Sequence, residues 1–222
     1  MYTDKHDDSL KMKQLNQYIN EKLILKKNLS SEYVDLGLPS GTLWATKNLG
    51  AEDENDVGDY FAWGETEPKK EFYADDKSNK FANTFNNISY SREYEKYNKI
   101  DGLKYLDPID DAATVILGKN WYIPTKDQIE ELLDNCNIER NGNSMFCLTS
   151  KINGQKIYFK CSGWKKEGDT HYLDSKVAFY SNTLSSDNFG HAWICAFPVL
   201  NGKKLTACAR YVGATIRPVK AK

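Results

Sequence analysis

The chain has 222 residues and a formal net charge of −1. A nearly neutral chain has no general attraction to nucleic acid or anionic lipid, and no Lys/Arg run is interleaved with aromatic residues as a nucleic-acid groove requires. The longest apolar runs are only a few residues, which excludes insertion into a membrane. With 40% hydrophobic and 13% aromatic residues, the chain can bury a sizeable core in one large domain or two small ones.

The N-terminus and the cysteines bear on the compartment. The first eight residues lack the basic and apolar regions of a secretory signal. We therefore expect a cytoplasmic or virion-associated protein, and one at the cell surface only if another route exports it. The cysteines are odd in number and contain no Cys-x-x-Cys spacing, so we expect free thiols rather than a zinc site. They are Cys136, Cys147, Cys161, Cys195 and Cys208.

Residues 1–31 are predicted to be a helical extension that precedes the main domain. Met12, Leu15 and Ile19 recur at three- and four-residue steps, which predicts an amphipathic helix over residues 9–27. Two interpretations stay open. The helix either docks on its own domain or joins copies of the chain into a homo-oligomer.

From residue 33 onward the sequence is typical of β structure. Strands are predicted at residues 33–38 and 42–49, on either side of a Pro-Ser-Gly turn. Residues 66–100 are polar, rich in Lys, Asn and Tyr, and weakly periodic. We interpret them as a long surface excursion.

Two helices are predicted in the middle of the chain. Asp107-Pro108 is a capping pair for a short helix that ends at Gly118. Thr125 and Gln128 form a capping box for a second helix. One face of this second helix is predicted to be apolar, with Ile129, Leu132, Leu133 and Cys136.

The rest of the chain is predicted to be strands. Asn153-Gly154 and Asn201-Gly202 are strong signals for two hairpins. The predicted strands are residues 145–151, 155–161, 177–182, 191–200, 203–212 and 215–219.

Five short sequence motifs, in this order along the chain, resemble those of the Fibrobacter succinogenes major paralogous domain family, which is abundant in gut Bacteroidetes. The resemblance covers roughly residues 32–219. Its words are Tyr33-Val34-Asp35-Leu36-Gly37-Leu38-Pro39-Ser40-Gly41-Thr42-Leu43-Trp44-Ala45, Gly58-Asp59-Tyr60-Phe61-Ala62-Trp63-Gly64-Glu65-Thr66, Leu106-Asp107-Pro108 with Asp110-Asp111-Ala112-Ala113, Trp121-Tyr122-Ile123-Pro124-Thr125 and Ile216-Arg217-Pro218-Val219.

The resemblance implies a fold similar to C-type lectins and formylglycine-generating enzymes. We therefore expect an α+β, C-type-lectin-like domain over residues 32–222, with a twisted antiparallel sheet and two helices. The N-terminal amphipathic helix precedes it. The terminal strands are expected to lie close together. The family resemblance implies little about activity, because one fold supports many functions.

Catalysis has few candidates in this sequence. A formylglycine-generating-type copper oxidoreductase needs two close cysteines, and Cys195 and Cys208 are equidistant from Asn201-Gly202, so we considered that they face each other across the hairpin. His191 shares a strand face with Cys195, but at about 13 Å it is too far for a nucleophile–base pair. We expect no catalytic residue and no enzyme activity.

Calcium is a second candidate cofactor, since lectin-like folds often use it. Glu52, Asp53, Glu54, Asp56 and Asp59 supply clustered carboxylates, the ligands that hard cations prefer. The lectin sugar-site words Glu-Pro-Asn and Trp-Asn-Asp are absent. A solvated acidic loop is therefore the default, and we expect no cofactor and no metal ligand.

The final hairpin is apolar on both faces, although an outward face is normally polar. Either both faces are buried in a purely structural or assembly role, or they form an exposed binding surface. For the second case the predicted ligand-binding residues are Trp193, Ile194, Ala196, Ala207, Cys208, Ala209, Tyr211 and Val212.

Genetic variation offers one context for such a surface. Variable proteins of diversity-generating retroelements, many of them phage tail proteins, have a lectin-like fold whose C-terminal hairpin holds the variable residues, and the final hairpin of this chain resembles that region. Mutagenesis of template Asn codons at adenines yields residues such as Ile, Ala, Cys, Tyr and Val. The sequence thus predicts a non-catalytic module that binds a protein or glycan ligand.

Overall fold

The computed structural model describes residues 12–13, 17–18, 33–76, 79–86, 91–142, 144–198 and 205–222, and only the backbone of residues 82–86 and 91–92. Met12, Lys13, Gln17 and Tyr18 have helical backbone and exposed side chains. The rest of the helix predicted over residues 9–27 lies outside the described residues. Neither its docking nor its role in assembly is tested.

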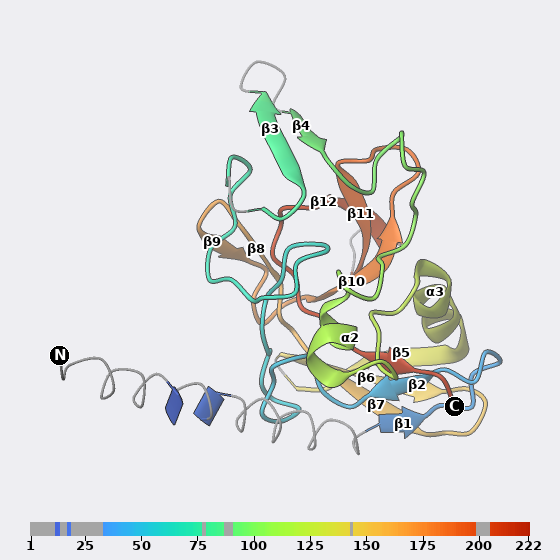
Figure 1. The fold of residues 1–222 in the computed structure, drawn as a ribbon. Helices are drawn as coiled ribbons and strands as arrows, with labels where there is room; N and C mark the ends of the chain where they lie inside the picture. The colour runs from blue at the N-terminus through green and yellow to red at the C-terminus, as the bar shows by residue number, and fades with distance from the viewer. Residues whose placement is uncertain are drawn as a thin grey trace.

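Short strands dominate the described part of the chain, with two short helices between them (Figure 1). In chain order the elements are β1 (Tyr33–Asp35), β2 (Leu43–Ala45), β3 (Ala82–Asn86), β4 (Ser91–Tyr94), α2 (Ala112–Leu117), α3 (Lys126–Asn135), β5 (Cys136–Arg140), β6 (Met145–Ser150), β7 (Lys156–Lys160), β8 (Trp164–Lys166), β9 (Asp169–His171), β10 (Val177–Leu184), β11 (His191–Phe197), β12 (Leu205–Ala209) and β13 (Val219–Lys220).

The described strands form small antiparallel sheets, not one continuous sheet. Three sheets have three strands each, in the orders β1-β2-β13, β5-β6-β7 and β10-β11-β12. The pairs β3-β4 and β8-β9 stand apart as two-stranded sheets. The fold-class prediction, an α+β C-type-lectin-like fold with one twisted sheet, two helices and a preceding N-terminal helix, is therefore wrong. The described structure is mostly β.

The small sheets surround two large apolar cores, and Tyr60, Ala62 and Phe72 form a third, smaller cluster. The Trp63 core includes Phe61, Trp63, Trp121, Tyr180, Ala192 and Ile194. The Trp44 core includes Trp44, Phe159, Phe179, Cys195 and Phe197. Strands β10 and β11 send alternate side chains into the two cores, because successive residues of a strand point to opposite faces. The other strands then pair locally around one core or the other.

The two ends of the described chain meet in one sheet, as the sequence predicted. Strand β2 lies between β1 and β13, with Trp44 opposite both Val34 and Val219. This sheet lies at the lower end of the molecule in Figure 1, and the β3–β4 hairpin lies at the opposite end. The strand predicted at residues 215–219 forms only in part: β13 covers Val219–Lys220, and Thr215 makes an isolated parallel bridge with Phe179.

Both predicted helices form, but one cap differs. Thr125 caps α3, and Thr125 and Gln128 satisfy each other's backbone N–H groups in the predicted capping box. Ile129, Leu132 and Leu133 are buried as predicted. The helix α2 is capped by Asp111, not by Asp107, because the Asp111 carboxylate accepts from the Thr114 N–H.

The predicted Asn153-Gly154 hairpin also forms, between β6 and β7. Gly154 has φ +75°, which glycine adopts without strain, and the last β6–β7 pair is Thr149 with Lys156, so the loop is longer than a two-residue turn. Strand β5 pairs with the other side of β6 and was not predicted. It begins directly where α3 ends, so no turn signal separates the two elements.

The excursion at residues 66–100 is anchored in the core. Phe72, Phe81 and Tyr97 are buried, and Tyr97 packs edge-on against Trp63 with ring centroids 5.2 Å apart. The polar composition of residues 66–100 therefore did not indicate that three aromatic side chains in this segment are buried. None of the helices in the described part of the chain has the length and apolar character needed to cross a membrane.

Candidate functional site

The structure removes three residues from the predicted binding surface. Ile194, Ala196 and Val212 are buried, with 3%, 5% and 3% of their surface exposed. Ile194 packs in the Trp63 core, and its neighbour Cys195 packs in the Trp44 core. Both faces of β11 are thus covered by the protein's own packing from Ile194 to Phe197, and Val212 is covered as well, so these three residues do not contribute to an exposed contact surface.

The other five predicted residues keep some exposure, but they do not share one face. Trp193 pairs with Ala207, and His191 pairs with Ala209, so these side chains lie on one face of the β11–β12 ladder. Ala207 is exposed and Trp193 is half-buried. Cys208 lies on the opposite face against the Trp63 core.

Tyr211 belongs to neither face, because it follows the end of β12. Its ring lies 5.9 Å from the Lys166 ammonium on β8. Because Lys166 belongs to the β8–β9 hairpin, Tyr211 extends the surface away from Trp193. The predicted single patch is therefore two separate surfaces.

The surroundings of Trp193 include residues that sequence reasoning missed. The Lys126 ammonium at the start of α3 lies 5.0 Å from the Trp193 ring centroid. It also donates a 2.7 Å hydrogen bond to Glu130, and its backbone N–H donates to the Thr183 hydroxyl at 3.0 Å. We use the name Trp193 face for Lys126, Thr183, Trp193, Ala207 and Ala209.

One local sequence pattern bears on the contact between Lys126 and Trp193. The capping box at Thr125 fixes where α3 begins, and so puts Lys126 at the first helical position. Only the packing of α3 against β10 brings that position next to Trp193. Aromatic rings attract cations over their faces, so the pair holds both side chains in place.

The two cysteines considered for copper chemistry do not meet. Cys195 pairs with Leu205 and Cys208 pairs with Ala192, so the observed register differs by three residues from the predicted one. The side chains consequently point to opposite faces of the sheet. The last described β11–β12 pair is Cys195 with Leu205, and the turn predicted at Asn201-Gly202 lies outside the described residues. Burial also raises the pKa of Cys208 to about 11, which keeps it a neutral thiol.

The acidic loop uses some of its carboxylates internally. The Asp56 carboxylate accepts from the backbone N–H groups of Glu52 and Gly58, and the Asp53 carboxylate accepts from that of Asn55. In the described ranges no group of three or more His, Cys, Asp or Glu side chains is arranged to hold a metal ion. The expectation that this loop is solvated and holds no cofactor stays a prediction.

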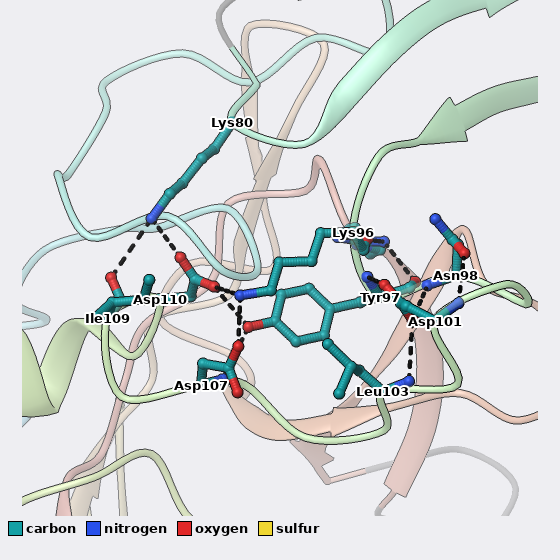
Figure 2. Close-up of polar contacts among 10 residues, drawn as sticks. Lys80, Lys96, Tyr97, Asn98, Asp101, Leu103, Asp107, Ile109 and Asp110 are labelled. Atoms are coloured by element: carbon teal, nitrogen blue, oxygen red, sulfur yellow. Dashed lines mark hydrogen bonds and ion pairs between the residues drawn. The ribbon is translucent and has the colours of Figure 1, made fainter.

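A polar network lies elsewhere, around the buried Asp110 (Figure 2). Its carboxylate accepts from Lys80 at 2.6 Å, from Lys96 at 2.7 Å and from the Tyr97 hydroxyl at 2.6 Å. Figure 2 shows the two lysines reaching Asp110 from different directions. Lys96 also pairs with Asp107.

The pKa values of the groups in this network do not suit proton transfer near neutral pH. Burial alone raises the pKa of Asp110, but the hydrogen bonds from Lys80, Lys96 and Tyr97 outweigh it and lower the pKa. Burial lowers the pKa of Lys96, but hydrogen bonds to Asp107 and Asp110 raise it above its ordinary value. Burial raises the pKa of Tyr97 to about 12. A general acid or base works best with a pKa near the operating pH, so this network is suited to holding structure.

Arg210 connects the network to the final hairpin. It directly follows β12, is 1% exposed, and donates to the backbone carbonyls of Lys96, Tyr97 and Phe189. Its guanidinium lies 3.8 Å from the Tyr94 ring centroid. The segment that Asp110 fixes through Lys96 and Tyr97 therefore also fixes the end of β12.

Neither protein-family models, nor curated proteins, nor solved structures match this chain. The family resemblance drawn from the five sequence words accordingly stays a prediction.

Proposed function

We propose that this chain is a non-catalytic binding module that contacts a protein partner through the Trp193 face. The observation that carries the proposal is a half-buried tryptophan beside an exposed alanine on the outer strand of a sheet. Tryptophan anchors dominate binding energy at protein interfaces when small neighbours leave the ring accessible.

The framework around the face supports this role. Trp193 is restrained by Lys126, and the end of β12 is restrained by Arg210. A side chain held in place before binding loses little conformational freedom on binding. A protein fits better than a glycan, because Ala207 and Ala209 offer no hydrogen-bonding side chains and sugars need many.

Non-catalytic action is also a proposal, and the candidates for chemistry support it. Cys195 and Cys208 lie on opposite faces, and the Asp110 network holds its groups away from a pKa near neutrality. If retroelement diversification acts on this gene, we expect variable codons at Ala207, Ala209 and Tyr211, and constant codons at Ile194 and Val212, because substitutions at buried positions disturb the cores.

Affinity capture from a lysate of cells that naturally express the gene tests the surface. The baits are the wild type, Trp193→Ala, Ala207→Arg and the control Val115→Arg, which alters an exposed position on α2. We expect partners enriched by wild type and control but lost with both face variants, at equal thermal stability of all baits. Equal recovery by all four baits contradicts the proposal. Binding of the wild type to a glycan array that Trp193→Ala abolishes contradicts the protein partner.

A further inference from the structure

The outer edge of β12 carries main-chain groups that no other strand of its sheet uses. The sheet order is β10-β11-β12, so β12 is an edge strand among the described strands. Natural edge strands are usually protected by lysine, proline or a bulge. The β12 sequence Leu-Thr-Ala-Cys-Ala has no charged residue and no proline, and Thr206 and Ala207 are exposed.

The hydrogen bonds at the end of the hairpin show which groups face outward. The Arg210 N–H donates to the Gly190 carbonyl, and the His191 N–H donates to the Asn188 carbonyl. Antiparallel pairs alternate between bonded and non-bonded positions. Thr206 therefore bonds toward β11, and the N–H and C=O groups of Leu205 and Ala207 point to the free edge.

We infer that β12 recognises its partner by strand addition, in which an extended segment of a partner polypeptide pairs antiparallel with residues 205–209. This inference rests on the proposed function and names the kind of partner. An extended segment is the chemical complement of a row of outward N–H and C=O groups.

A second copy of β12 fits this edge less well than a foreign segment. Symmetric pairing about Ala207 sets Leu205 of one copy against Ala209 of the other and requires the Ala209 carbonyl. That carbonyl already accepts from the Val212 N–H and from the Tyr180 hydroxyl. A foreign segment can end its pairing at the Ala209 N–H.

The side chains next to the edge suggest what the segment carries. A residue paired with Ala207 stands on the Trp193 face, two strands away from Trp193, and the small Ala207 side chain leaves the space between them open. A large apolar side chain on that residue can cross Ala207 to contact the Trp193 ring. The partner segment is therefore an extended peptide with one large apolar residue flanked by residues that tolerate a β conformation.

Peptides selected from a phage-displayed library of random linear dodecapeptides test the inference against the full chain. Ala207→Pro removes one outward N–H and no bond to β11, and proline is tolerated at such edge positions. Thr206→Val is the control, because it changes an exposed side chain next to Ala207 and leaves every backbone N–H of β12 in place. We expect Ala207→Pro to weaken binding about tenfold or more, as the loss of one such hydrogen bond implies, and Thr206→Val to leave it unchanged.

Binding of N-methylated synthetic peptides to the wild-type protein is a second test that needs no protein variant. This test distinguishes strand addition from other binding modes even if Ala207→Pro fails to fold. Strand addition predicts loss of binding at every second peptide position. Uniform tolerance, or a selection that yields no peptide, overturns the inference. If Trp193→Ala abolishes peptide binding but Ala207→Pro does not, strand addition alone is overturned. If Ala207→Pro abolishes peptide binding but Trp193→Ala does not, the proposed role of the Trp193 face alone is overturned.

Discussion

Replacing Asp110 by asparagine tests whether its network holds the long excursion to the body of the protein. The Asp110 side chain is 2% exposed, and it accepts hydrogen bonds from two ammonium groups and one hydroxyl. Asparagine keeps the shape, but its neutral amide removes the charge and turns an NH₂ group toward a lysine. The lysines then lose their common partner.

The expected cost follows from how exposed the partners are. Removing one member of a buried ion pair costs about 3–5 kcal/mol, because the other charge is left buried. The Lys80 and Lys96 side chains are 38% and 27% exposed, so water can solvate part of their charge. We therefore expect Asp110→Asn to lower the free energy of unfolding by about 2–3 kcal/mol, and the melting temperature by about 4–12 °C for a chain of this size.

Thermal and urea unfolding followed by circular dichroism measures this change. Asp107→Asn is the matched control, because it also loses an ion pair with Lys96 but its side chain is 45% exposed. We expect the control to cost less than about 1 kcal/mol, as exposed pairs do. Equal effects of the two substitutions, or a more stable Asp110→Asn variant, refute this reasoning.

Two further predictions concern other buried charges. Burial raises the pKa of Asp111 to about 6, above that of an unfolded aspartate, so the native state favours the protonated form. We expect the wild type to lose about 2 kcal/mol of stability relative to Asp111→Asn as pH rises from 4 to 6, as urea midpoints measure; parallel pH profiles contradict this. Arg217 is buried and donates to Asn48 and to three backbone carbonyls, so we expect Arg217→Lys to cost about 3 kcal/mol or more. The exposed Arg140→Lys is the control, and equal losses for the two lysine variants contradict the structural role of the guanidinium.

Features encoded within a few residues of sequence were predicted correctly. The Thr125 capping box and the Asn153-Gly154 hairpin both formed, because a side chain that satisfies a nearby backbone N–H, or a glycine that accepts positive φ, acts locally. The apolar face of α3 followed from its spacing alone.

The fold class could not be obtained in this way. Alternating apolar residues on β10 and β11 predict strands, but they do not state that two cores lie on opposite sides. The arrangement of the described strands into several small sheets depends on which segments distant in sequence pack together. The resemblance to a known family supplied a sheet architecture that packing did not produce.

The sequence by itself determined that the final hairpin is apolar on both faces, and only the tertiary structure decided what that means. Ile194 and Ala196 are covered by the protein's own packing, whereas Ala207 is exposed. Trp193 meets Lys126, and Asp110 meets Lys80, across distances in sequence that no local pattern spans. The physical reason is that caps and turns depend on neighbouring residues, whereas burial and charge pairing depend on whatever the rest of the chain brings to the same place.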